Sequence, residues 1–425
     1  MIIAAGLLLL LLALFGAPLF AVIAAGAMLR FHIAGINLSV VPIEIYRLAE
    51  TPVLLAIPLF TFAGYLVSES RAPTRLVHIT RALLGWMPGG FAIIALMACA
   101  MFTAFNGASG VTIIALGALL YPALKEAGYS DRFSLGLVTT SGSLGVLFAP
   151  ALPLILYGVI AQQQGVGGAF TIDDMFLAGV LPCLLMLFML SVWSMWHNRG
   201  QKLYGFSPIE AWRALREAAW ELPLPFIVLG GIYSGYLAVS EAAAATAIYV
   251  IIVEVFIYRE IPFSSLPRIM RESMVLVGAI MVILGTSMAS TNAMIDAQVP
   301  SRLFAVLREH ITSPFTFLAL LNVFLLFLGT MLDIFSALVL MVPLLLPIAT
   351  GYGIDPVHLG VIFLANMQLG YFTPPVGMDL FLSSFRFEKS IIEVYRATLP
   401  FFFILLVAVL IITYWPALSL TLPGR

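Results

Sequence analysis

The sequence predicts an all-α polytopic membrane protein, and three observations support this fold class. Of the 425 residues, 62% are hydrophobic and 10% are charged, a composition that soluble domains of this length do not have. Apolar runs long enough to cross a bilayer recur along the chain. Between them, Gly- and Pro-containing interruptions fall inside apolar sequence rather than in polar loops.

A full crossing needs about 20 apolar residues. The segments expected to cross are 2–29, 52–67, 176–196, 223–238, 241–258, 274–290 and 398–418. The first of them lacks a basic start and is too long for a signal peptide, so it is expected to remain as a membrane helix.

Two apolar regions are each split near the middle. Region 91–123 is divided by NGASG (106–110), and region 314–348 is divided by TMLD (330–333). Each half has about 15 residues and rises about 22 Å, which is short of the roughly 30 Å hydrocarbon core. We therefore predict two re-entrant helical hairpins, each of which enters and leaves on one side of the membrane.

Two further spans contain prolines that a regular helix excludes. Segment 134–161 is interrupted at GVLFAPALP, and segment 358–385 is interrupted at GYFTPPVG. Backbone groups freed at membrane depth are tolerated only against protein or a water-filled cavity. These segments predict two broken transmembrane helices.

The order of span, hairpin and broken span occurs twice, and residues 126–150 align with 350–374. Five predicted crossings separate the starts of the two copies: 52–67, 134–161, 176–196, 223–238 and 241–258. Because this number is odd, the two copies are expected to be inverted repeats. Inverted repeats are typical of secondary transporters.

Charge predicts the orientation. If the base of the first hairpin is cytoplasmic, 15 of the 20 Lys and Arg residues lie inside, and Arg30, Arg47, Arg302, Arg308 and Arg425 lie outside. The N-terminus is then cytoplasmic and the C-terminus periplasmic. The basic stretches 75–86 and 209–222 are either interfacial amphipathic helices or ordinary loop helices.

Composition also limits the chemistry. A net charge of −1 argues against a nucleic-acid-binding surface. No HExxH, P-loop or plausible nucleophile–base pair is present, so neither an enzyme activity nor a cofactor is expected. Cys99 and Cys183 lie in apolar segments and are expected to be core residues.

The hairpin tips and broken helices are expected to meet near the membrane midplane. Helix N-termini after Ser109 and Asp333 suit an anion, whereas carbonyls at helix ends and side-chain oxygens suit a hard cation such as Na⁺. Asp333 is an intramembrane acid and is expected to be functional. Asp379 is either functional or placed near the inner membrane surface, and Glu241 and Glu254 are expected to make a structural polar contact or to lie at the membrane interface.

Three stretches resemble the large membrane subunit of tripartite ATP-independent periplasmic (TRAP) transporters, and the resemblance covers nearly the whole chain. They are FNGASGVTIIALGALLYPALKEAGYS, SGSLGVLFAPALPLILYG and MLDIFSALVLMVPLLLPIATGYGIDPVHLGVIFLANMQLGYFTPPVG. The resemblance implies a Na⁺-coupled elevator-type transporter of the ion transporter superfamily in the bacterial inner membrane. It also implies a small four-helix membrane subunit and a periplasmic substrate-binding protein that delivers an organic acid.

The same resemblance implies the site residues. The first sodium site would use Asn106, Gly107, Ser109, Gly145 and Pro150, and the second would use Asp333, Ser336, Gly370, Thr373 and Pro375. The substrate site would use Ser109, Gly110, Ser143, Asn366, Thr373 and Pro374. Some members carry a basic residue where this chain has TNAMID (291–296), so helix N-termini and hydroxyls are expected to bind the anion.

The expected organisation has a scaffold and a transport domain. Residues 1–90 form scaffold helices and an interfacial arm, 91–161 the first transport half, 162–313 connecting scaffold helices and the second arm, 314–385 the second transport half, and 386–425 a C-terminal transmembrane helix. The sequence ends at Arg425 without a four-helix segment, so the small subunit is expected to be a separate chain. The alternatives are a self-sufficient Na⁺/anion symporter, an intramembrane enzyme and a passive pore.

Overall fold

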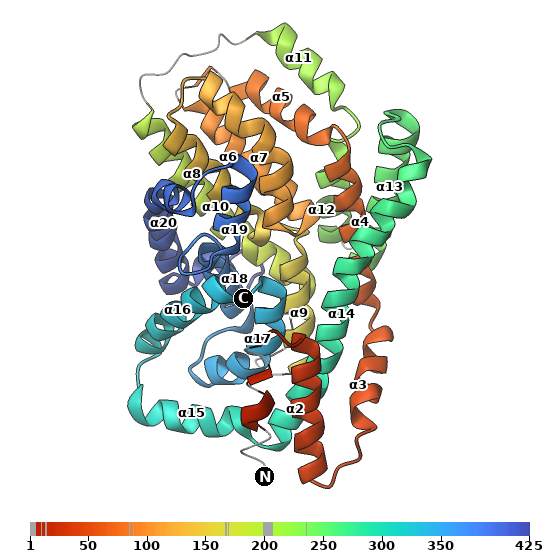
Figure 1. Ribbon diagram of the computed structural model, residues 1–425, viewed down its shortest axis with the longest axis vertical. Coiled ribbons are helices and arrows are strands. Elements are labelled where there is room, and N and C mark those ends of the chain that lie inside the picture. Colours follow the sequence, from red (N-terminus) through yellow and green to blue (C-terminus); the bar gives the residue numbers. More distant parts are fainter. Residues whose placement is uncertain are drawn as a thin grey trace.

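The computed structural model describes residues 6–9, 11–12, 15–84, 86–87, 89–165, 168, 170–198, 207–234 and 236–425. Throughout this part of the chain the regular elements are helices (Figure 1), and eight helical segments are long and apolar enough to cross a membrane. The predicted all-α membrane fold is therefore confirmed. The extreme N-terminus, 1–5, and the basic residues Arg199 and Lys202, which the orientation prediction used, lie outside the described residues.

The two predicted hairpins are each interrupted where the sequence indicated. The first comprises α6 (Gly90–Asn106) and α7 (Ser109–Glu126), and the second comprises α16 (Pro314–Met331) and α17 (Ile334–Gly351). Their arms contain 17 to 18 residues, more than the predicted 15. At 1.5 Å per residue they reach about 25–27 Å, still below the roughly 30 Å core.

The two broken helices are also interrupted as predicted. The first consists of α8 (Asp131–Ser141), the short helix η2 (Leu144–Leu147) and α9 (Leu152–Gln164). The second consists of α18 (Pro356–Gly370) and α19 (Met378–Phe387), which are joined by 371–377. Each break contains one cis peptide bond, Ala149–Pro150 in the first and Pro374–Pro375 in the second.

The remaining helices form a column and several helices that lie outside it. The column contains η1 (Pro52–Leu55), α4 (Ala56–Glu69), α12 (Pro223–Tyr233), α13 (Val239–Ile251), η3 (Ile252–Ile257), η4 (Phe263–Ser265) and α14 (Leu266–Asp296). Beside it lie α2 (Leu19–Ile33) and α3 (Val40–Ala49), which pack on α14. The other helices are α5 (Ala72–Leu84), α10 (Ile172–His197), α11 (Pro208–Glu217), α15 (Val299–His310), α20 (Ile391–Tyr414) and α21 (Ala417–Leu420).

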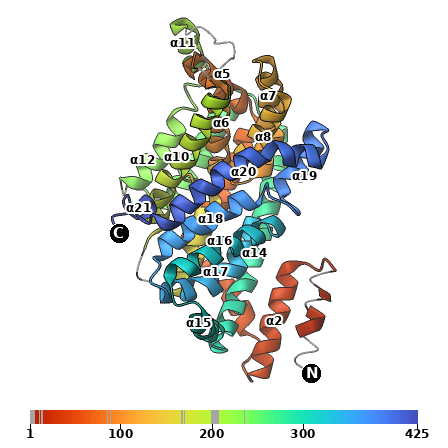
Figure 2. The ribbon, with the colours of Figure 1, turned by 90° about the vertical axis from the view of Figure 1, so that its left-hand side faces the viewer.

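The hairpins and broken helices interlock into one block. Helix α6 packs on η2, α16 packs on α18, α17 packs on α9, and α7 packs on α19. The helices α10 and α20 pack against this block, and α20 crosses it diagonally in Figure 2. The column of α4, α13 and α14 runs along its other side (Figure 1). Helix α10, which the predicted boundaries assign to the scaffold, therefore lies against the interrupted helices.

Two predicted spans differ from the structure. Segment 2–29 is not one helix, because α2 begins at Leu19 after a turn in which Gly16 has φ of 84° and Pro18 is the N-cap. Segment 223–238 contains only the 11-residue α12, which rises about 17 Å and is too short for a crossing. The crossing count that predicts inverted repeats includes 223–238, so the inversion stays a prediction.

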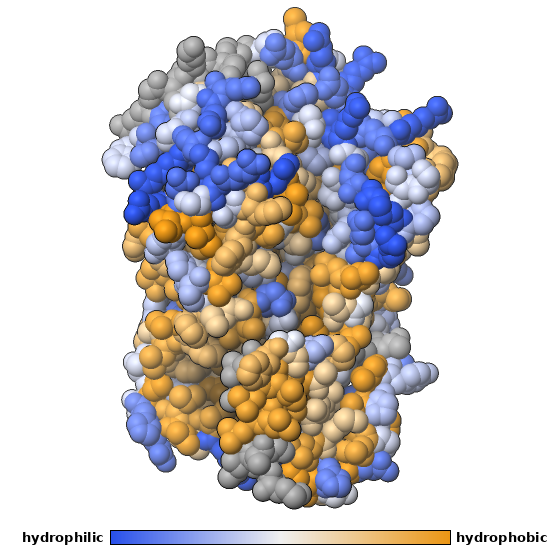
Figure 3. All heavy atoms as spheres, in the orientation of Figure 1, coloured by the Kyte–Doolittle hydropathy of each residue, from blue (hydrophilic) through white to orange (hydrophobic). Residues whose placement is uncertain are grey.

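The surface has a hydrophobic band and polar ends. Figure 3 shows hydrophobic residues across the middle and lower part of this face, and hydrophilic residues gathered at the end that carries α5 and α11. These two helices carry predicted inner basic residues, whereas α15 at the opposite end carries Arg302 and Arg308, which are predicted to lie outside. Both predicted basic stretches, 75–86 and 209–222, are helical over most of their length.

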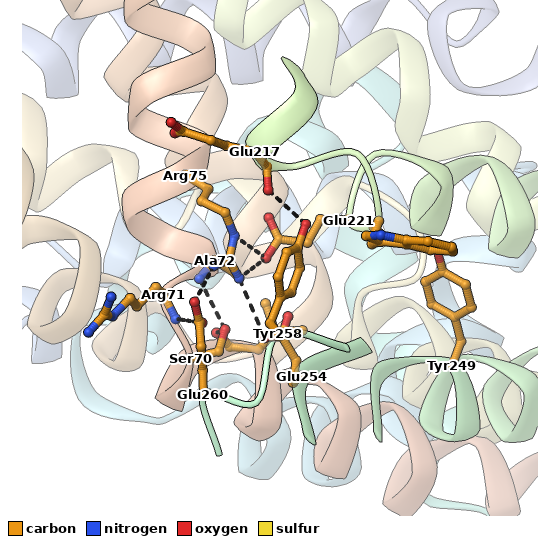
Figure 4. Close-up of polar contacts among 12 residues, drawn as sticks. Ser70, Arg71, Ala72, Arg75, Glu217, Glu221, Tyr249, Glu254, Tyr258 and Glu260 are labelled. Atoms are coloured by element: carbon orange, nitrogen blue, oxygen red, sulfur yellow. Dashed lines mark hydrogen bonds and ion pairs between the residues drawn. The ribbon is translucent and has the colours of Figure 1, made fainter. Parts of the chain in front are cut away.

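A buried ionic cluster holds α5 against the column (Figure 4). The Arg75 guanidinium contacts the carboxylates of Glu221, Glu254 and Glu260, and its carbon lies 4.0 Å from the centre of the Tyr258 ring. The side chains of Arg75 and Glu254 are 10% and 2% exposed. The expected structural role of Glu254 is therefore confirmed, and Glu241 likewise accepts a hydrogen bond from the Ala238 backbone N–H at 2.9 Å.

Candidate functional site

The tip of the first hairpin is a tight turn closed by its own asparagine. Asn106 ends α6, and its Oδ1 accepts a hydrogen bond from the Ala108 N–H at 2.7 Å. Gly107 has φ of 70°, a left-handed conformation that glycine adopts without a steric penalty. NGASG thus interrupts the helix while both its asparagine side chain and its backbone remain hydrogen-bonded. All of these residues except Ala108 and Gly110 are buried.

A hydroxyl network joins this tip to the first broken helix. Thr103 Oγ1 donates to the Gly142 carbonyl at 2.7 Å and lies 2.7 Å from Thr112 Oγ1. The Asn106 amide donates to Thr112 Oγ1 at 3.2 Å. Sequence reasoning missed Thr103 and Thr112, although two threonines flanking a polar tip inside apolar sequence were a readable signal.

Glycines allow the break and the tip to touch. A Cβ on Gly145 would meet the Ala100 carbonyl oxygen and would lie 2.6 Å from the Ala104 nitrogen. A Cβ on Gly107 would lie 2.7 Å from the Leu152 side chain, at the other end of the break. Pro150 is buried two residues before Leu152. The structure therefore brings the five residues of the predicted first sodium site into one neighbourhood.

The tip of the second hairpin is capped by its acid. Asp333 is the N-cap of α17, and its Oδ1 accepts hydrogen bonds from the N–H groups of Phe335 and Ser336, both at 3.0 Å. Asp333 is exposed and Ser336 is buried. The acid thus caps the helix that leaves the tip, as aspartate commonly does at a helix N-terminus.

The second break closes around this tip. The hydroxyl of Tyr371 accepts a hydrogen bond from the Ile334 N–H at 2.7 Å, and the Gly377 N–H donates to the Thr330 carbonyl at 3.1 Å. Gly370 packs directly on Gly329, since a Cβ there would lie 2.5 Å from the Gly329 Cα.

Three more predicted residues lie in the same break. Thr373 Oγ1 donates to the Leu369 carbonyl at 2.6 Å. Pro374 is half-buried and Pro375 is exposed. The break thus presents backbone and hydroxyl oxygens beside Asp333, which is an arrangement suited to a hard cation.

Contacts from the broken helices join the two halves. Ser109 Oγ donates to Asp379 Oδ1 at 2.7 Å, and Ser143 Oγ lies 3.4 Å from the Gln368 carbonyl oxygen. Gly110 touches Leu382 of α19, because a Cβ on the glycine would lie 2.6 Å from the leucine Cδ1. The segment 371–379 therefore touches both hairpins, through Gly377 and through Asp379.

Asn366 lies on α18 one helical turn before Gly370 and is bonded to other helices of the block. Its amide donates to Asn322 Oδ1 of α16 at 2.6 Å and to the Ile362 carbonyl at 2.9 Å. Thr413 of α20 donates to the same Asn322 oxygen at 3.1 Å. The amide is thus engaged between helices of the block, and the described contacts do not bring it together with Ser109, Gly110 or Ser143.

Two cavities lie between the column and the block. One is lined by α9, α14 and α17 and includes Gln163, Gln164, Ser287, Thr291 and Asn292. Its polar lining residues are neutral, and two of them belong to the TNAMID stretch. The other cavity is mostly apolar, and its lining includes Phe105, Glu221 and Glu254.

Comparisons with known proteins agree with this architecture. The family described as "Tripartite ATP-independent periplasmic transporter, DctM component" matches residues 4–418. The chain is 36% identical to the C4-dicarboxylate TRAP transporter large permease protein DctM of Pseudomonas aeruginosa, over 90% of this chain and 88% of that protein. It is 29% identical to the ectoine/5-hydroxyectoine TRAP transporter large permease protein UehC of Ruegeria pomeroyi, over 87% of this chain and 85% of that protein.

A fused relative and a solved structure complete the comparison. The isethionate TRAP transporter permease protein DctMQ of Oleidesulfovibrio alaskensis is 33% identical over 87% of this chain, which spans 58% of that protein. The YdaH transporter of Alcanivorax borkumensis shares the fold, with a TM-score of 0.64 at 13% identity over 98% of this chain and 99% of that one. The relatives are transporter permeases rather than enzymes. The chain itself belongs to the family of TRAP transporter large permeases, the DctM component.

Proposed function

We propose that this large permease takes up an organic acid anion across the bacterial inner membrane and that the uptake is coupled to Na⁺. One observation carries the proposal: both hairpin tips place helix ends and oxygen-bearing side chains in direct contact with the broken helices. Around the first tip these are Thr103 with the Gly142 carbonyl, Gly107 with Leu152, and Ser109 with Asp379. Around the second tip they are Asp333, Ser336 and the 371–377 segment.

The proposed substrate class rests on the substrates named for the relatives and on the neutral polar lining of one cavity. Relatives are named for C4-dicarboxylates, isethionate and ectoine, so small organic acids are the class to test first. The neutral cavity beside TNAMID supports recognition of the anion by amides, hydroxyls and helix N-termini instead of a lysine or arginine side chain.

The proposed motion is an elevator movement of the block of interrupted helices past the column. The interlocked packing of both hairpins with both broken helices supports movement as one body, and α10 and α20 pack with that body. Ser287 of α14 donates to the Val339 carbonyl of α17 at 2.6 Å, a contact between column and block that such a movement would break. A separate small membrane subunit and a periplasmic binding protein are the proposed partners.

The test measures Na⁺ binding and uptake separately. The purified chain is heated in NaCl and in choline chloride at equal ionic strength, because an ion that binds the folded state raises its thermal stability. The complex with its small subunit and binding protein is then reconstituted for uptake of a panel of small organic acids. We expect stabilisation by Na⁺ over choline, and uptake driven by an inward Na⁺ gradient.

Substitutions of Asp333 separate charge from capping. Asn at this position keeps an oxygen for the N–H groups of Phe335 and Ser336 and removes the charge, whereas Ala removes both. We expect Asp333→Asn and Asp333→Ala to lose alike the part of the Na⁺ response that comes from the second site. Asp355→Ala is the matched control, because Asp355 caps α18 by the same kind of bond, to the Val357 N–H at 2.8 Å, at the end of that helix opposite the break.

Two results would contradict the proposal. One is equal stabilisation by sodium and choline salts, together with uptake that ignores the Na⁺ gradient. The other is an Asp333→Asn variant that retains the wild-type response to Na⁺. Uptake by the chain without a binding protein would favour the self-sufficient symporter instead.

A further inference from the structure

Asp379 is a buried acid that the predicted sites do not include. It is the second residue of α19, its side chain is fully buried, and its N–H donates to the Tyr371 carbonyl at 2.9 Å. Oδ1 accepts the hydrogen bond from the Ser109 hydroxyl. Among the described residues, Oδ2 has no hydrogen-bond partner. A buried carboxyl oxygen is thus left without a partner beside the first hairpin tip.

Basic side chains on α19 and on the helices that pack against it have other partners in the described part of the chain. Lys125 of α7 and Lys389 both pair with Asp131 of α8 at 2.8 Å. Arg386 of α19 donates to the Ile114 carbonyl at 3.2 Å. Arg132 of α8 donates to the carbonyl of Arg396, which is itself exposed on α20. No ion pair recorded for the described residues involves Asp379.

The other titratable groups on the neighbouring elements are acids and a tyrosine, and none of these can neutralise an ionised Asp379. The Tyr371 hydroxyl is bonded to the Ile334 N–H, and the Asp333 carboxylate is bonded to N–H groups of its own helix. Glu126 on α7 and Glu393 on α20 are exposed. An ionised carboxylate without a partner is costly to bury, and a bound cation would offset that cost.

The position of Asp379 identifies which cation would fit. Its partner Ser109 belongs to the predicted first sodium site, whose five members Asn106, Gly107, Ser109, Gly145 and Pro150 are all neutral. The second predicted site has its own carboxylate, Asp333. A free carboxylate oxygen beside hydroxyl and carbonyl oxygens fits a hard cation, which prefers oxygen ligands.

We propose that Asp379, through its free Oδ2 and its contact with Ser109, is the carboxylate of the first sodium site. This inference rests on the proposed Na⁺ coupling and adds to it the acid that neutralises the first ion. Each hairpin tip then has one carboxylate. The second tip has its own acid, Asp333, whereas the first tip receives Asp379 from the second broken helix. Because Gly377, two residues before Asp379, bonds to Thr330 at the end of α16, the segment 371–379 links the two ion sites.

The test compares Asp379→Asn with a neutral substitution on the same helix. Asn keeps an acceptor for the Ser109 hydroxyl and removes the charge. Ser383→Ala is the matched control, since Ser383 is buried on α19 and its hydroxyl lies 2.9 Å from Thr139 Oγ1 without carrying charge. Thermal stability of the full chain is titrated with NaCl against choline chloride, so that the readout is Na⁺ affinity and not activity.

We expect Asp379→Asn to raise the Na⁺ concentration for half-maximal stabilisation at least about tenfold and to reduce the cooperativity of the titration. Ser383→Ala is expected to lower the thermal stability without changing the Na⁺ affinity. Asp379→Glu, which restores the charge, is expected to recover part of the affinity. An Asp379→Asn variant that binds Na⁺ as the wild type does would overturn the inference, because Asp379 would then be a neutral buried acid.

A further measurement keeps the outcomes distinct. If Asp379→Asn does not fold, the wild-type chain is compared by infrared difference spectroscopy in NaCl and choline chloride. The same comparison is made for Asp333→Asn. A carboxylate band that responds to Na⁺ in both proteins supports the inference, and a band that responds only in the wild type contradicts it. Wild-type protein that shows no Na⁺ response at all contradicts the proposed function itself, whereas a response independent of Asp379 contradicts only this inference.

Discussion

Gly64 of α4 lies directly against the backbone of the first hairpin tip: a Cβ on this glycine would lie 2.5 Å from the carbonyl oxygen of Phe105 and 2.7 Å from the Cα of Asn106. The neighbouring atoms belong to the main chain, so no side-chain rotation can relieve the overlap. The column therefore supports the hairpin tip at a point where even an alanine does not fit.

The first prediction is that Gly64→Ala disfavours this arrangement of column and block. Overpacking of this kind costs about 1–3 kcal/mol, which corresponds to a population shift of roughly 5- to 150-fold away from the contact. We expect a clear loss of initial uptake rate in reconstituted complex. Gly278→Ala on α14 is the control, because a Cβ there meets nothing within 4 Å. Wild-type uptake and wild-type stability in Gly64→Ala would refute the prediction.

The second prediction concerns Asn366, which the resemblance assigns to substrate binding. Its amide bonds to Asn322 inside the block, so Asn366→Leu removes one donor to the Asn322 oxygen and leaves the Thr413 hydroxyl as another. A lost intramolecular hydrogen bond costs about 0.5–1.5 kcal/mol, whereas replacing both partners with apolar residues is close to neutral. We expect Asn322→Leu/Asn366→Leu to unfold at a higher temperature than Asn366→Leu alone.

Thermal unfolding of Asn322→Leu, Asn366→Leu and the double variant, measured by scanning fluorimetry, checks this expectation. A double variant whose loss equals the sum of the two single losses would show that the Asn–Asn pair is not the reason for their burial. An Asn366→Leu variant with wild-type stability and a raised KM for uptake would return Asn366 to the substrate site.

The third prediction concerns the Arg75 cluster shown in Figure 4. Removing one partner from a buried ion pair costs about 3–5 kcal/mol, and Arg75→Gln would leave three carboxylates without their cation. Arg268→Gln is the matched control, because Arg268 pairs with Glu69 and Glu272 while all three side chains are 40–44% exposed. Exposed pairs of this kind contribute at most about 1 kcal/mol.

The effect of Arg75→Gln is expected to depend on pH. Burial raises the pKa of Glu221 above its ordinary value, against the opposing effect of Arg75. A carboxyl with a raised folded-state pKa favours the folded state at low pH, and that contribution is lost as pH rises through the folded pKa. Loss of Arg75 raises this pKa further, so the stability deficit of Arg75→Gln should grow from acidic to alkaline buffer. A deficit independent of pH would contradict the expected rise in the pKa of Glu221.

Local chain chemistry explains how well the interruptions were predicted. The breaks at 107–108, 142–151 and 371–377 follow from residues that cannot continue a helix, such as prolines without an N–H and a glycine in a left-handed conformation. The break at 332–333 is marked instead by Asp333, which caps the following helix. Hydropathy alone was less reliable for helix ends, since α12 stops at Tyr233 and the predicted span 2–29 contains a turn before Leu19.

The sequence by itself determined that the chain is a helical membrane transporter, where its helices are interrupted and which oxygen-bearing residues flank those interruptions. Only the tertiary structure decided how these residues pair: Ser109 with Asp379, Thr103 with the Gly142 carbonyl, and Asn366 with Asn322. The reason is physical. Helix interruption depends on the stereochemistry of a few adjacent residues, whereas a buried polar side chain takes its partner from whatever distant segment the packing of the whole chain places beside it.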